Sequence, residues 1–232
     1  MTRTPSTSRR ERSEEIKKQF KAKERRRSLA FFGALTVVAA ALITTAAIGA
    51  RNLSHDKGAK ASANLQSSSG RGAESAPPWG LPADAAGRVK TAGLTLGQMG
   101  TADHYHVHLD VLVDGQPVPL LANIGIDPSS GQMSGLHTHS ADGLVHIEAG
   151  TKGQPFTLGQ LFTEWNVRLT ADRLGSLAAD KKNTLAAYVN GKKVAGNPAM
   201  VRLVTHQEIA IVYGPKNAKI KVPSTFTFSA GE

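Results

Sequence analysis

The longest apolar stretch of the chain, residues 28–50, contains no charged side chain and is rich in Ala, Leu, Val, Ile and Phe. As a helix rising about 1.5 Å per residue it would be ~34 Å long, enough to cross a bilayer core. Arg25-Arg26-Arg27 precede it and a single Arg51 follows. The positive-inside rule therefore predicts a cytoplasmic N-terminus and an extracytoplasmic segment from residue 51 onward. A cleaved signal peptide is the alternative, because Ala47-Ile48-Gly49-Ala50 offers small residues for cleavage.

Two polar segments flank this predicted transmembrane helix. Residues 1–27 carry eleven Lys and Arg residues against four Asp and Glu, a large part of the net charge of +10. Their position beside a membrane span predicts contact with anionic lipid headgroups, and we expect no nucleic-acid partner. Residues 51–83 are rich in Ser, Gly, Ala and Pro without hydrophobic periodicity, which predicts a flexible linker. Trp79, near its end, is expected to dock onto the edge of the following domain.

Residues 84–232 show the patterns of a globular α+β domain. Polar and apolar residues alternate in His104–Val113, which predicts a half-buried strand, and Asp114-Gly115 predicts a turn into a returning strand. Thr157 is a suitable N-cap for a helix whose apolar residues recur at helical spacing. The other expected elements are a short helix over Asp84–Ala92, strands over Val118–Ile126, Leu136–His139, Leu144–Glu148, Asn183–Val189, Lys192–Val194 and Glu208–Tyr213, the main helix over Leu158–Trp165, and an edge segment over Ile220–Phe228.

Two hairpins flanking one helix, followed by a closing strand, is the order of a β-grasp (ubiquitin-like) sheet. The stretch from Ala187 through Val212 resembles the corresponding half of small sulfur-carrier β-grasp proteins, and the resemblance extends to the fold only. Those carriers need a free Gly-Gly end, whereas this chain ends Ala230-Gly231-Glu232. We therefore expect a mixed sheet with one main helix and a β-hairpin insertion over residues 117–145.

A second set of sequence blocks runs from Pro77 to the C-terminus: Pro77-Pro78-Trp79, His106-Val107-His108-Leu109-Asp110-Val111 with Asp114-Gly115, Ile124-Gly125-Ile126, Leu136-His137-Thr138-His139, Gly143-Leu144-Val145-His146-Ile147-Glu148 and Phe156–Phe162. In these blocks the chain resembles a family of largely uncharacterised bacterial proteins with an N-terminal membrane anchor and a small extracytoplasmic domain. The resemblance implies the same anchored arrangement and no established activity. In that family the position of Ser140 is often acidic, so a ligand held by that carboxylate would be held more weakly here.

Histidines are the most distinctive chemical feature of the predicted domain. In a strand alternate side chains share a face, so His104, His106 and His108 would lie together, opposite the apolar residues. Several imidazoles with a carboxylate suit Zn²⁺, Cu²⁺ or Ni²⁺, and the absence of cysteine excludes thiolate ligands and disulfides. The predicted metal ligands are His106, His108, His137, His139 and His146, with His104, Glu148 and Asp110 as secondary candidates.

The sequence therefore predicts a single-pass membrane protein whose extracytoplasmic histidine face binds a transition metal for metal handling or sensing. Two alternatives stay open. The histidines could be polar strand residues of an envelope-protein interaction module without metal, and their repulsion when protonated could make that module sensitive to pH. A small zinc hydrolase with Glu148 as general base is the other alternative, although the sequence has no common hydrolase, phosphate-loop or dinucleotide motif.

Overall fold

The computed structural model describes residues 70–97 and 100–232. The predicted basic tail (1–27), the predicted transmembrane helix (28–50) and the first part of the predicted linker (51–69) lie outside the described residues. Within the described ranges, no helix is long and apolar enough to cross a membrane.

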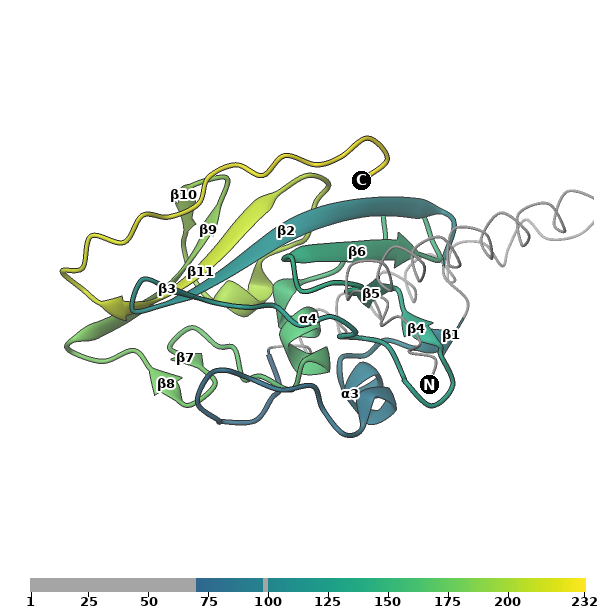
Figure 1. Cartoon of the computed structure of the whole chain (residues 1–232), viewed down its shortest axis with the longest axis horizontal. Helices are drawn as coiled ribbons and strands as arrows, with labels where there is room; N and C mark the ends of the chain where they lie inside the picture. The colour runs from purple at the N-terminus through teal and green to yellow at the C-terminus, as the bar shows by residue number, and fades with distance from the viewer. Residues whose placement is uncertain (1–69, 98–99) are drawn as a thin grey trace, which may run out of the picture. The chain divides into compact units, whose positions relative to one another are not determined.

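The described part of the chain is an α+β domain built on a mixed seven-stranded sheet (Figure 1). The strand order is β10-β9-β11-β2-β6-β5, and β3 pairs with β2 beside this path. The central pair β2 and β11 is parallel, and the other pairs are antiparallel. The strands of this sheet are β2 (Asp103–Val113), β3 (Gln116–Val118), β5 (Leu136–His137), β6 (Leu144–Ala149), β9 (Asn183–Val189), β10 (Lys192–Val194) and β11 (Glu208–Pro215).

Shorter elements surround the sheet. Two small antiparallel pairs join β1 (Leu96–Gly97) to β4 (Met133–Ser134) and β7 (Arg173–Leu174) to β8 (Leu177–Ala178). The described helices are α3 (Ala85–Thr91), α4 (Leu158–Glu164) and the 3₁₀ turn η1 (Pro198–Met200). As predicted, Asp84 caps α3, and its side chain accepts a hydrogen bond from Gly87 N.

Helix α4 packs against one face of the sheet and forms the centre of the core. Its start is set by a capping box, in which Thr157 accepts from Gln160 N while the Gln160 side chain accepts from Thr157 N. Every residue of α4 is buried. The inward-facing side chains of β2 pack into the same cluster: Val107, Leu109 and Val111. The predicted strand and its apolar face are therefore confirmed.

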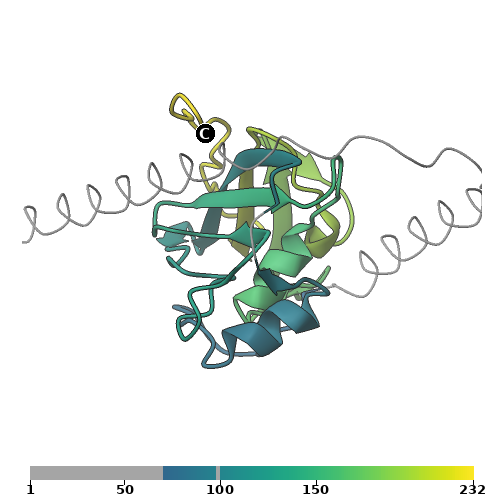
Figure 2. The same ribbon diagram turned by 90° about the vertical axis from the view of Figure 1, so that its right-hand side faces the viewer.

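The opposite, outer face of the sheet is crossed by the C-terminal segment, residues 216–232. Figures 1 and 2 show this segment and the two α-helices on opposite sides of the sheet. Ile220 and Val222 pack on a small second cluster that contains Leu112 and Val212. The predicted edge strand over Ile220–Phe228 does not form. The segment lies over the face of the sheet instead of pairing along its edge, and Pro223 has no backbone N–H for a ladder.

The predicted returning strand over Val118–Ile126 is also wrong, because β3 ends at Val118 and an irregular loop follows. Asn123 (φ 68°) and Gly125 (φ 73°) have left-handed backbone conformations, which an extended ladder does not accept. Side-chain hydrogen bonds hold this loop. The Thr138 hydroxyl accepts from Ile124 N and donates to Leu121 O.

Part of the predicted linker packs against the domain. Ala73 forms a parallel bridge with Val167, and the side chain of Trp79 is only 4% exposed. The Trp79 ring meets Trp165 edge to face with centroids 5.5 Å apart, and its Nε1 donates to Ser75 O. An indole with both an aromatic partner and a satisfied N–H is a stable anchor for an otherwise polar segment.

Replacing this anchor should destabilise the domain. We expect Trp79→Ala to lower the free energy of unfolding by about 3 kcal/mol, because it leaves a large cavity beside Trp165. Urea unfolding of the full chain in mild detergent, followed by circular dichroism, measures the change. Leu81→Ala is the matched control: its side chain is 46% exposed, so it should change stability by less than about 0.5 kcal/mol. Equal effects of the two substitutions would contradict the packing of Trp79.

Candidate functional site

Sheet register places three histidines in one row across three neighbouring strands. His106 of β2 lies opposite His146 of β6, and His146 lies opposite His137 of β5. Directly opposed residues in antiparallel strands have side chains on the same face and in contact range. The register therefore explains why segments that are distant in sequence bring their imidazoles together. His137, and not His139, is the residue paired with His146.

Two further histidines complete a five-histidine cluster, defined here as His104, His106, His137, His139 and His146. His106 Nε2 is 2.9 Å from His146 Nδ1, and His137 Nε2 is 3.1 Å from His139 Nε2. The ring centroids of neighbouring histidines in the cluster lie 4.4–5.3 Å apart. The predicted ligands His106, His137, His139 and His146 are thus brought together.

The tautomer of His137 follows from its surroundings. His137 Nδ1 is 2.8 Å from the carbonyl oxygen of Ser134, which can only accept, so Nδ1 carries the proton and donates. His137 Nε2 is then unprotonated, and its lone pair is directed at His139. Metal-binding histidines show the same arrangement, with one nitrogen held by a backbone carbonyl or carboxylate and the other left for the ion.

The cluster contains two groups of three side chains whose ligand atoms lie within 4.8 Å of one another: His137, His139 and His146, and His104, His106 and His146. Nitrogens that share one zinc ion at about 2.0–2.1 Å lie within about 4.2 Å of each other. The pairs at 2.9 and 3.1 Å are already inside that limit. In either group, small side-chain rotations would bring the third ligand atom within that limit.

The five-histidine cluster is buried on one side and open to solvent on the other. His137 and His106 are 0% and 3% exposed, His146 is half-buried, and His104 and His139 are exposed. An ion can therefore reach the exposed rings from solvent and be held by the buried ones.

Burial and mutual repulsion keep His106, His137 and His146 neutral. Burial, with a contribution from the neighbouring His139, lowers the pKa of His137 to about 4 and that of His146 to about 3. Burial and His104 also lower the pKa of His106. Near neutral pH these three rings are unprotonated, which is the form that binds metal.

His108 belongs to a different group. It leans toward β11, where its Nδ1 is 2.7 Å from Glu208 Oε2 and 3.9 Å from Asp110 Oδ2. Its ring is stacked on Phe226 of the C-terminal segment, with centroids 3.9 Å apart. Burial acts to lower the pKa of His108, but the hydrogen bond and charge of Glu208 raise it overall. The predicted ligand set therefore divides, because the neighbours of β2 draw His106 and His108 in opposite directions.

The remaining predicted residues lie at the edges of these groups. Glu148 Oε1 is 3.7 Å from His104 Nε2, at the rim of the five-histidine cluster. Asp110 accompanies His108. Sequence reasoning missed Ser134 and Glu208. Ser134 acts through a backbone carbonyl, which carries no sequence signal, and Glu208 meets His108 only because β11 is parallel to β2 in one particular register.

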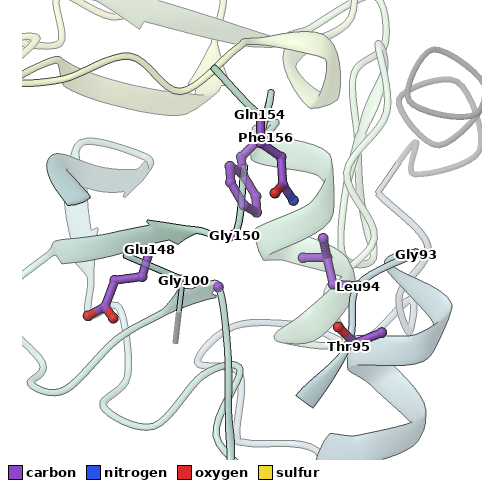
Figure 3. A pocket seen from close by; sticks show the side chains of 9 residues that line it. Gly93, Leu94, Thr95, Gly100, Glu148, Gly150, Gln154 and Phe156 are labelled. Atoms are coloured by element: carbon purple, nitrogen blue, oxygen red, sulfur yellow. The ribbon is translucent and has the colours of Figure 1, made fainter. Parts of the chain in front are cut away.

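A cavity of about 210 Å³ lies near the C-terminal end of β6 and is lined by Leu94, Thr95, Gln154 and Phe156 together with several glycines (Figure 3). Glu148 is part of its wall, but its side chain points away from Phe156 and Leu94 (Figure 3). No histidine lines this cavity. The cavity and the five-histidine cluster therefore share no histidine, although Glu148 lies at the edge of both.

No protein family matches the chain, and no curated protein or solved structure is significantly similar to it. The histidine clusters that could hold a metal ion are therefore a conclusion from geometry alone.

The lowered pKa values predict acid sensitivity of the metal-free protein. The rings of His137 and His146 are neutral in the folded protein but bind a proton below about pH 6.5 in the unfolded protein. Their contribution to stability is therefore present above that pH and is lost as pH falls toward 4. The loss should reach about 1.4 kcal/mol per pH unit for each ring. Urea unfolding of chelator-treated protein between pH 7 and 4.5 measures it.

His137→Asn combined with His146→Asn should flatten this pH dependence, even though the double variant is less stable at pH 7. An unchanged slope would show that other groups cause the acid sensitivity. Glu208→Gln should have the opposite effect on the pH dependence. The raised pKa of His108 adds stability below pH 6.5 that is lost as pH rises, and removing the Glu208 carboxylate should remove this contribution.

Proposed function

We propose that this protein is a single-pass, membrane-anchored extracytoplasmic protein whose five-histidine cluster binds a transition metal ion for metal handling or sensing. The row formed by His137, His146 and His106 across three strands is the observation that carries the proposal. Three neutral imidazoles held side by side on the outer face of the sheet, two of them buried, are a costly arrangement without a ligand that they share.

The donor set favours borderline transition metals. Imidazole nitrogen is a good ligand for Zn²⁺, Cu²⁺ and Ni²⁺, whereas Ca²⁺ and Mg²⁺ require oxygen. We assign His137, His139 and His146 as the main ligands, because the lone pair of His137 already faces His139. His106 is the fourth candidate, 2.9 Å from His146.

A purely hydrogen-bonded cluster explains the geometry less well. His106 Nδ1 is buried and has no hydrogen-bond partner among the described residues. Leaving a buried polar nitrogen unpaired costs about 1–3 kcal/mol. A network selected for hydrogen bonding alone would be expected to satisfy this nitrogen, whereas an ion bound to it would give it a partner.

We infer that the domain is β-grasp-like. Support comes from the order β10-β9-β11-β2-β6, with the first and last long strands parallel at the centre and α4 between the two halves in sequence. The segment between β2 and β6 is then an insertion in that fold. It carries β5, and with it both His137 and His139, so the insertion supplies half of the proposed ligand set.

The membrane anchor and the extracytoplasmic location rest on the sequence. Support comes from the uncharged residues 28–50 and from the arginines that precede them. A domain tethered to the extracytoplasmic side of the membrane could deliver an ion to a partner protein in the envelope, or could sense ions on behalf of that partner.

Metal titration tests the proposed function. The chelator-treated full chain in mild detergent is titrated with Zn²⁺, Cu²⁺ and Ni²⁺ while its melting temperature is followed. Metal at about 100 times its Kd should add about 2.7 kcal/mol of stability. His139→Ala removes an exposed ring that faces His137 and should weaken binding at least tenfold.

His206→Asn is the matched control for loss of a histidine outside the cluster. His206 has a left-handed backbone conformation (φ 57°), which Asn tolerates well, so the change should leave both fold and metal affinity intact. A chain stabilised by none of the three ions, or a shift that His139→Ala does not affect, would refute the proposed site.

A further inference from the structure

The outer face of the sheet holds a second group of candidate ligands, on the β11 side of β2. This carboxylate–histidine group consists of His108, Asp110 and Glu208, whose ligand atoms lie within 4.8 Å of one another. Glu208 lies directly beside His108 in the parallel register of β11 and β2, and Asp110 follows on the same face of β2. We propose that this group is a second divalent-cation site, with two oxygen ligands and one nitrogen ligand, that works independently of the five-histidine cluster.

The distances suit a single ion. His108 Nδ1 is 2.7 Å from Glu208 Oε2 and 3.9 Å from Asp110 Oδ2. Nitrogen and carboxylate oxygens bound to one ion at about 2.0–2.2 Å lie no more than about 4.4 Å apart. Both distances lie within that limit, and the Asp110 side chain, which is 33% exposed, has room to adjust to an ion.

The orientation of His108 is fixed from its other side. His108 Nε2 is 3.0 Å from the carbonyl oxygen of Asp142, so Nε2 carries a proton and donates. His108 Nδ1 is thereby the nitrogen presented to the two carboxylates. In the metal-free protein Nδ1 shares a proton with Glu208 Oε2 at 2.7 Å, and a bound cation would displace that proton.

An unpaired buried oxygen is the independent observation that points to a cation. Glu208 is 2% exposed, and its Oε1 has no hydrogen-bond partner among the described residues. Two carboxyl groups face one imidazole at this place. A divalent cation balances both carboxylates and gives Glu208 Oε1 a partner.

The chemistry of this group differs from that of the five-histidine cluster. Two carboxylate oxygens and one imidazole accept harder ions such as Mn²⁺, which an all-imidazole set binds poorly. The two groups also face different neighbours, because His106 contacts His146 on β6 while His108 contacts Glu208 on β11. Phe226 is stacked on the His108 ring at an interplanar angle of 8° and covers this part of the site.

Mn²⁺ binding tests the proposal, because free Mn²⁺ has an electron paramagnetic resonance signal that is lost on binding. The chelator-treated full chain in mild detergent should bind one Mn²⁺. Glu208→Gln and Asp110→Asn, which keep the side-chain shapes, should each weaken Mn²⁺ binding at least tenfold. His139→Ala, in the five-histidine cluster, should leave Mn²⁺ affinity unchanged.

Circular dichroism checks that each variant folds, and if Glu208→Gln does not, the more exposed Asp110→Asn decides the outcome. A chain that binds no Mn²⁺, or binds it equally well after both carboxylate substitutions, overturns the proposal and leaves a simple ion pair between His108 and Glu208. The result is separate from the titration of the five-histidine cluster, since Zn²⁺, Cu²⁺ or Ni²⁺ binding that depends on His139 can succeed or fail by itself.

Discussion

The pairing of β2 on both of its edges is the constraint on which the rest of the described structure depends. With β11 on one side and β6 on the other, the backbone of β2 cannot rotate, so its alternate side chains must point to opposite faces. Val107, Leu109 and Val111 enter the core, and the histidines are held on the outer face. Packing of the core therefore positions the ligand atoms. A shift of the β2 register by one residue would disrupt both the core packing and the arrangement of the histidines.

The same pairing divides the outer face chemically. Each neighbouring strand contributes its own partner to the histidines of β2: imidazoles come from the β6 side and a carboxylate from β11. The segment between β2 and β6 adds two more imidazoles to the first group. One strand thus serves two groups of different ligand preference only two residues apart, without any change in its regular geometry.

Local signals account for what the sequence predicts well. Alternation in β2, the Thr157 cap of α4 and the Asp114-Gly115 turn each act within a few residues, and the structure confirms these elements. The division of the histidines could not be predicted, because it depends on which strands lie beside β2 and in which register. Glu208 lacked any local signal for the same reason. The loop after β3 was misjudged because Thr138, from a distant segment, holds it in place of a strand partner.

The parallel contact between β2 and β11 has a consequence for how the protein is made. His108 and Glu208 are separated by 100 residues, and Phe226, which stacks on His108, comes later still in the sequence. During synthesis the outer face of β2 must remain open until the final strand and the C-terminal segment emerge. Closing so long a loop also makes the central pairing late and slow. Ions present while the chain is still incomplete would therefore meet these side chains before Phe226 covers His108.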